Sequence, residues 1–131
     1  MGEVKGRLLV VEDQQDLREL LATAFSLEGY AVSTAASGEE ALALVQREVP
    51  DLIVLDLSLP GISGIETLRR IREGGRAPRV VILTAHGTPA HVREAMALGV
   101  REFMGKPFDL DQLLRVVADE MREVRPPPRD A

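Results

Sequence analysis

The stretch that decides the fold is DLIVLDLSLPGISGIE at residues 51–66. Four apolar residues, 52–55, are followed directly by Asp56, and Ser63 stands three residues before Glu66. A short apolar run bounded by polar residues is typical of a strand that is buried on both faces. A serine with a glutamate three residues later is typical of a helix start, because each side chain can satisfy a free backbone N–H of the other residue. The stretch therefore predicts a strand, a loop that follows an acid, and a helix.

The same alternation of strand and helix runs along the whole chain. Predicted strands cover residues 8–11, 31–34, 52–55, 80–83 and 103–104. The other predicted helix caps are Ser37, Thr88 with Pro89, and Asp109, and the predicted helix stops are Gly29, Pro50 and Gly99. Strands separated by helices run parallel. We therefore predict an α/β fold, a (βα)5 doubly wound parallel five-stranded sheet. The second and fifth strands mix polar with apolar residues and belong at the edges, which gives the flavodoxin-like order 2-1-3-4-5.

Composition restricts the classes of function. The chain has 131 residues, 45% of them hydrophobic, and 16 basic against 21 acidic residues give a net charge of −5. That balance argues against direct nucleic acid binding, which needs a basic face. The absence of cysteine excludes disulfides and cysteine-ligated metals. We find no membrane-spanning stretch or signal peptide and expect a cytoplasmic protein. We expect one domain over residues 1–124, with the proline-rich residues 125–131 as a tail or linker.

Polar residues follow the predicted strands at the edge where doubly wound sheets bind ligands. They are Glu12, Asp13, Asp56, Thr84 and Lys106. Strand order reverses between the first and third strands, so Asp13 and Asp56 are expected to face each other. Two carboxylates roughly 4 Å apart repel by about 4 kcal/mol at an effective dielectric near 20, and Mg²⁺, which prefers oxygen ligands, would offset that repulsion. Carboxylates, a divalent ion, a lysine and a hydroxyl are the parts of a phosphoryl-transfer site, with Asp56 as the nucleophile.

Each of these residues also has a plainer interpretation when it is taken alone. Asp13 could cap the first helix, Asp56 could be a turn residue, and Lys106 could be solvated. It is the joint occurrence of these residue types at one edge of the sheet that favours a site.

With these residues identified, the chain resembles the receiver domain of two-component response regulators from about Arg7 to Val124. Four motifs carry the resemblance: LLVVEDQQDLRELL (8–21), DLIVLDLSLPGISGIE (51–66), VVILTAHG (80–87) and FMGKPF (103–108). The resemblance implies a phosphorelay signalling domain rather than an enzyme, although it would assist its own phosphorylation and dephosphorylation. The implied partner is a sensor histidine kinase.

The resemblance also implies roles for the residues of the site. Asp56 would accept the phosphoryl group and form an aspartyl phosphate. Glu12, Asp13, Asp56 and the backbone carbonyl of Ser58 would hold Mg²⁺, with Glu12 acting through a metal-bound water. Lys106 would pair with Asp56 and then with a phosphoryl oxygen.

A switch is implied beside the acceptor. Thr84 would act in catalysis with Lys106 and move toward the phosphoryl group, and Phe103 would then turn inward. This would change the surface formed by the fourth helix, fifth strand and fifth helix. The plainer interpretation of Phe103 is an edge-strand core residue. A cis bond is implied before Pro107. The site rim would consist of Ser58, Ala85, His86 and Pro107. His91 is expected to face solvent.

Further partners are implied as well. An output domain could follow the C-terminus, and a homodimer could form through the same helix–strand–helix surface. The charged residues available there for pairing between chains are Arg93, Glu94, Arg101, Glu102, Arg115, Asp119 and Arg122.

Three alternative functions fit the sequence less well. A phosphatase of the haloacid dehalogenase type needs Asp-x-Asp, but Ser58 stands where the second aspartate would be. An FMN module needs a phosphate loop after the first strand, where the acids at 12, 13 and 16 would repel a phosphate. A degenerate receiver that serves only for docking would lack part of the acidic set.

Overall fold

The computed structural model describes residues 4–85 and 88–124, in which five strands alternate with five helices. The elements in chain order are β1 (Arg7–Val11), α1 (Gln15–Leu27), β2 (Ala31–Ala35), α2 (Gly38–Arg47), β3 (Leu52–Asp56), α3 (Gly64–Glu73), β4 (Arg79–Thr84), α4 (Pro89–Ala97), β5 (Glu102–Gly105) and α5 (Leu110–Val124).

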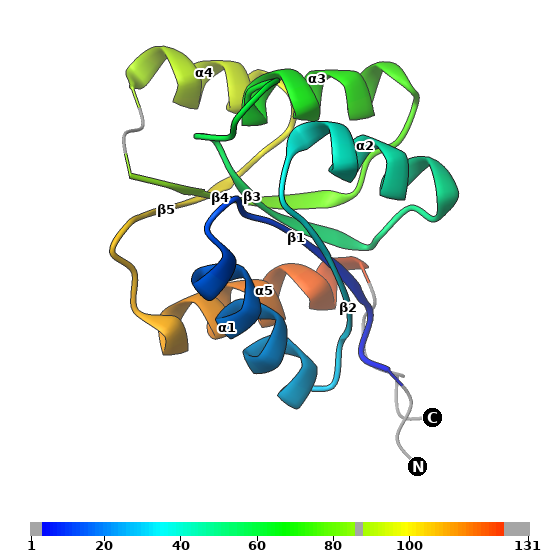
Figure 1. The fold of residues 1–131 in the computed structure, drawn as a ribbon, viewed down its shortest axis with the longest axis vertical. Coiled ribbons are helices and arrows are strands. Elements are labelled where there is room, and N and C mark those ends of the chain that lie inside the picture. The colour runs from blue at the N-terminus through cyan, green and yellow to red at the C-terminus, as the bar shows by residue number, and fades with distance from the viewer. Residues whose placement is uncertain (1–3, 86–87, 125–131) are drawn as a thin grey trace.

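The strands form one parallel sheet in the order β2-β1-β3-β4-β5. The predicted fold class, strand order and edge strands are thereby confirmed. Helices α1 and α5 cover one face of the sheet, and α2, α3 and α4 cover the other (Figure 1). Val11 lies opposite Leu55, and Asp56 lies opposite Leu83. The carboxyl ends of β1, β3 and β4 therefore reach the same edge of the sheet.

The core consists of two aliphatic clusters, one on each face of the sheet. All five residues of β3 are buried, as expected for the central strand. The aromatic contribution is small: Phe25 packs edge-on against Tyr30, with ring centroids 6.2 Å apart. Each buried aliphatic side chain contributes about 1.5–3 kcal/mol, so the sheet is a stiff base for the loops at its ends.

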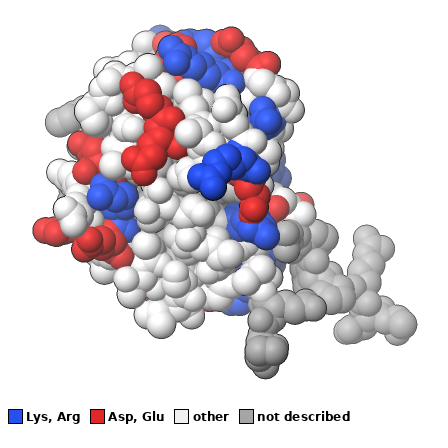
Figure 2. Space-filling view, turned by 45° about the vertical axis from the view of Figure 1, so that its right-hand side comes forward, with Lys and Arg blue, Asp and Glu red and all other residues white. Residues whose placement is uncertain are grey.

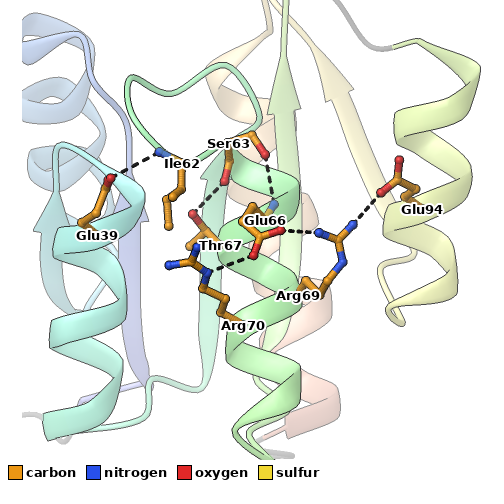
Figure 3. Close-up of polar contacts among 8 residues, drawn as sticks. All are labelled: Glu39, Ile62, Ser63, Glu66, Thr67, Arg69, Arg70 and Glu94. Carbon is orange, nitrogen blue, oxygen red and sulfur yellow. Dashed lines mark hydrogen bonds and ion pairs between the residues drawn. The ribbon is translucent and has the colours of Figure 1, made fainter.

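Helices α2 and α3 begin at the predicted serine caps, with one difference from the prediction. The Ser37 and Ser63 hydroxyls accept from the N–H groups of Glu40 and Glu66 at 3.1 and 3.0 Å. No return bond from either glutamate to the serine N–H is present among the described residues, so the reciprocal half of the capping box is wrong. The Glu66 carboxylate instead accepts from arginines on its own helix (Figure 3).

Two arginines of α3 contact α4 and its C-terminal end. Ala95 is the single buried residue of α4. Arg69 donates from Nη2 to Glu94 Oε2 at 2.8 Å (Figure 3), and Arg72 donates from Nε to the Leu98 carbonyl at 2.8 Å. These polar contacts add to the apolar packing of Ala95 and Val100 in the core cluster on this face of the sheet.

Candidate functional site

The loop after β1 carries the first two acids. The Glu12 N–H donates to the Ala35 carbonyl at 3.0 Å, which keeps residue 12 in line with the sheet, and the Glu12 side chain is buried. Asp13 is exposed. The residue preceding α1 is Gln14, and no side chain caps that helix. The interpretation of Asp13 as a helix cap is therefore wrong, and its carboxylate is available to the site.

Asp56 ends β3 and is 3% exposed. Its Oδ1 accepts from the Ser58 N–H at 2.9 Å, so the turn interpretation is correct for one oxygen. The other oxygen, Oδ2, faces Lys106. The start of α3 lies directly against this segment: a Cβ on Gly64 would stand 2.5 Å from the Asp56 carbonyl oxygen and 2.6 Å from Leu57 Cα. Only glycine fits there, so the helix start fixes the backbone that carries the acid.

Lys106 joins two of the acids. Its N–H donates to the Thr84 carbonyl at 2.9 Å, which continues the pairing of β5 with β4 past the end of the strand. Its Nζ lies 2.8 Å from Glu12 Oε1 and 2.9 Å from Asp56 Oδ2. The peptide bond to Pro107 is cis, as predicted. A fully solvated lysine is thus excluded, because the side chain is 17% exposed and makes two ion pairs.

The three acids form a compact cluster. Glu12, Asp13 and Asp56 each offer a carboxylate oxygen, and the three oxygens lie within 4.8 Å of one another. When all three acids are ionised, the ammonium of Lys106 leaves two negative charges uncompensated. Hard carboxylate oxygens at this spacing suit a divalent cation such as Mg²⁺, which binds through a few carboxylates and retains several waters. The donor set therefore fits the predicted ion.

The environment shifts the pKa of two groups in the cluster. Burial, aided by the charge of Asp56, raises the pKa of Glu12 above 4.5, against hydrogen bonds from Lys106 and the Gln14 N–H that lower it. Burial alone would lower the pKa of Lys106, but its hydrogen bonds and charge interactions with Glu12 and Asp56 outweigh burial and raise it above 10.5. Lys106 is therefore a permanent cation at neutral pH.

The remaining predicted residues surround this cluster or lie outside the described residues. Thr84 ends β4 and is 8% exposed. Phe103 is half-buried and packs against the core cluster on the face of α2, α3 and α4. The exposed predicted residues are Ser58, Ala85, Pro107 and His91. His86 lies outside the described residues.

Sequence reasoning missed Arg18 and the backbone of Gln14. Arg18 Nη1 donates to the carbonyls of Glu12 and Asp13, and the Gln14 N–H donates to Glu12 Oε2 at 3.1 Å. The available signal was a basic residue one turn into α1, close after two acids. A cavity of about 650 Å³ lies elsewhere, between α2 and the beginnings of β1 and β2, where Arg7 and Arg47 line it. It does not include any of the acids, which lie at the opposite edge of the sheet.

Comparisons with known proteins agree with this geometry. A family model described as the response regulator receiver domain matches residues 8–118. Sporulation initiation phosphotransferase F of Bacillus subtilis is 41% identical over 82% of this chain and 86% of its own length. The phosphate regulon transcriptional regulatory protein PhoB of Rhizobium meliloti is 36% identical over 92% of this chain and 54% of its own length. The chain thus spans about half the length of PhoB and of several other relatives.

Solved structures give the same result. The receiver domain of the Francisella response regulator 1452 matches with a TM-score of 0.84 and 28% identity, over 92% of this chain and 99% of that one. Chemotaxis protein CheY4 of Vibrio cholerae matches with a TM-score of 0.81 and 28% identity, over 90% and 98%. The chain therefore belongs to the response regulator receiver domain family, the signalling domain of two-component systems.

Proposed function

We propose that Asp56 accepts a phosphoryl group from the phosphohistidine of a sensor kinase, in a reaction that depends on Mg²⁺. The observation that carries the proposal is the position of the Lys106 ammonium, 2.8 Å from Glu12 and 2.9 Å from Asp56, beside three clustered carboxylates. A surface aspartate in a turn would have no partly buried lysine and no buried second acid next to it.

The chemistry is the exchange of one bond to phosphorus for another. An oxygen of the Asp56 carboxylate forms a bond to phosphorus as the P–N bond of the donor breaks, and the departing imidazole takes up a proton from solvent. Lys106 holds its ammonium where an oxygen of the phosphoryl group gathers charge. Water later attacks phosphorus, the P–O bond to Asp56 breaks, and inorganic phosphate leaves as the carboxylate is restored. The domain thereby assists both steps while it serves as a signalling domain.

Glu12, Asp13 and Asp56, with the carbonyl of Ser58, would hold Mg²⁺. The bound ion would neutralise charge on the carboxylates and on the transferred group. Glu12 is buried and already bonded to Lys106 and to the Gln14 N–H, which suits a role through a metal-bound water rather than as a direct ligand.

Phosphorylation adds about −1.5 to −2 charges and strong acceptor oxygens. Thr84 ends β4 beside Lys106, so its hydroxyl can donate to one of those oxygens after a small movement. Phe103 is half-buried and can turn inward as Thr84 leaves its place. The surface of α4, β5 and α5 changes shape as a result, which would signal to an output domain or partner.

The proposed context is cytoplasmic signalling, with residues 1–124 as the receiver domain and an output domain beyond the C-terminus. No helix in the described residues is long and apolar enough to cross a bilayer. Figure 2 shows a largely uncharged face on which basic and acidic side chains stand in separate small groups, which does not suit direct nucleic acid binding.

A homodimer through α4, β5 and α5 is also proposed. Several of the charged side chains named for it already pair within the chain. Glu94 pairs with Arg69, Arg101 with Glu123, and Arg122 with Asp119. A dimer would have to exchange these pairs or use other residues.

The test is labelling of the intact protein by radioactive acetyl phosphate with and without Mg²⁺. Wild type is expected to take up label only with Mg²⁺, and Asp56→Asn is expected to take up none. The matched control is Asp111→Asn, which changes an exposed acid of the first turn of α5 and is expected to label normally. Labelling of Asp56→Asn at the wild-type level would place the acceptor elsewhere.

A further inference from the structure

Arg18 contacts the backbone that carries two of the three acids. It lies in the first turns of α1 and is half-buried. Its Nη1 donates to the Glu12 carbonyl at 2.9 Å and to the Asp13 carbonyl at 3.2 Å. The guanidinium thus binds main-chain oxygens and leaves the carboxylates of these residues to the site.

These two bonds complete the support of a very short loop. Residues 12–14 connect β1 to α1. The Glu12 N–H is bonded to Ala35 on one side of the loop, and the Gln14 carbonyl accepts the first backbone bond of α1, from Arg18 N, at 2.9 Å on the other. The side chain of Arg18 fixes the part between, so the same residue holds the loop through both its backbone and its side chain.

We propose that Arg18 is a positioning residue that raises the affinity of the acidic cluster for a divalent cation; the inference rests on the proposed function of that cluster. Fixing the backbone of one residue costs about 1–2 kcal/mol in conformational entropy. A loop that is ordered before the ion binds avoids that cost at the moment of binding. Charge-assisted bonds from a guanidinium are strong enough to impose this order.

The positive charge of Arg18 would weaken Mg²⁺ binding, whereas its positioning of the loop would strengthen it, so one measurement of Mg²⁺ affinity can separate the two effects. A positive guanidinium near a cation site repels the cation, so if charge alone mattered, its removal would tighten binding. If Arg18 positions the ligands, its removal weakens binding despite the loss of a positive charge. The direction of the change in the Mg²⁺ dissociation constant separates the two.

The experiment is calorimetric titration of the full chain with Mg²⁺ for wild type, Arg18→Gln and Arg18→Lys. Outer residues that orient metal ligands typically change affinity by 10–100-fold, and we expect an increase in the dissociation constant of about 10-fold for Arg18→Gln. Arg18→Lys keeps a charged donor and is expected to recover part of that loss. The matched control is Arg47→Gln, which changes the net charge equally at an exposed position of α2 and is expected to leave the affinity unchanged.

The free energy of unfolding in urea with EDTA is measured for each variant, because a purely structural role would lower it along with the affinity. A weakened affinity with unchanged metal-free stability supports the inference. Equal or tighter Mg²⁺ binding by Arg18→Gln overturns it. The inference is also overturned if Arg18→Gln loses Mg²⁺ affinity only together with metal-free stability and Arg18→Lys does not recover the affinity. If Arg18→Gln fails to fold, an unchanged affinity in Arg18→Lys overturns it. Wild type that ignores Mg²⁺ would instead remove the proposed function itself.

Discussion

Replacement of Gly64 by alanine tests how the start of α3 fixes the acceptor strand. The added Cβ would stand 2.5 Å from the Asp56 carbonyl oxygen and 2.6 Å from Leu57 Cα, both of them backbone atoms of a buried strand end. Neither atom can move without shifting the strand. Overpacking of this kind costs about 1–3 kcal/mol, and alanine regains about 0.5–1 kcal/mol in helix propensity. We expect a net loss of about 1–2 kcal/mol in the free energy of unfolding.

Two further glycines near the end of the same helix are matched controls. A Cβ on Gly74 would meet first the end of the flexible Arg76 side chain at 3.1 Å, so Gly74→Ala is expected to change stability by less than about 0.5 kcal/mol. Gly75 has open space around it but a φ of +81°, so Gly75→Ala is expected to lose about 1 kcal/mol through backbone strain alone.

The assay is urea unfolding followed by circular dichroism, together with Mg²⁺-dependent labelling by acetyl phosphate. Gly64→Ala is expected to reduce labelling, because it displaces Asp56, whereas the two controls leave labelling intact. If Gly64→Ala were as stable and as readily labelled as Gly74→Ala, the close approach of α3 would not be what positions the acceptor.

Three further predictions concern ionisation and ion pairs. Because the pKa of Glu12 is raised in the folded state, the difference in free energy of unfolding between wild type and Glu12→Gln in EDTA is expected to fall as pH rises above 4.5. Mg²⁺ affinity is expected to rise over the same pH range, because the ionised carboxylate attracts the ion. Urea unfolding and Mg²⁺ titration at several pH values measure both trends, and a stability difference that grew with pH would contradict the prediction. Lys106→Met leaves Glu12 and Asp56 without their cation and is expected to cost about 2 kcal/mol at neutral pH without metal, with Mg²⁺ raising its melting temperature more than that of wild type. A double-mutant cycle on Arg69 and Glu94 is expected to give a coupling of about 0.5 kcal/mol, since both side chains are more than a third exposed, and amide exchange is expected to accelerate in α4.

The prediction for the Arg69–Glu94 pair has an internal control on the same helix. Arg70 pairs with Glu66, as Arg69 does, but lies at 49% exposure and has no described contact with α4. Arg70→Gln is therefore expected to leave exchange in α4 unchanged. Equal acceleration in both variants would mean that the intrahelical pairs, and not the contact with Glu94, protect α4.

Most of the fold was predictable because local and global signals agree. The continuous apolar run at 52–55 is short and bounded by polar residues, which indicated a strand buried on both faces, and caps such as Ser63 and Thr88 marked helix starts where the structure has them. The reciprocal half of the capping boxes failed because it depends on competing partners. Glu66 has arginines three and four residues further along its helix, and these bind its carboxylate.

The side chains that form the site could be predicted from the sequence, whereas the residues that hold them in position, Arg18 and Gly64, could not. Strand ends in a parallel sheet meet at one edge, so Asp13 and Asp56 could be placed together from strand order alone, whereas the pairing of Lys106 with Asp56 was implied by the family resemblance. The role of Arg18 could not be predicted from the sequence. Its side chain bonds to backbone carbonyls, which every residue has, so no particular partner residue type marks the contact. Gly64 was likewise recognisable as part of a helix start but not as a point of close approach, which depends on the angle between α3 and β3.

The bonds of Lys106 to residues 50 and 94 positions earlier have a consequence for how the domain matures. During synthesis the strands that bear the acids emerge well before the strand that delivers the ammonium. Until β5 docks at its edge of the sheet, the carboxylates of Glu12 and Asp56 repel each other without a neighbouring cation. Their negative charge attracts the ammonium of Lys106 and so favours docking of β5. Docking of the last strand therefore completes the sheet and brings Lys106 to its two acids in the same step, before α5 covers its face of the sheet.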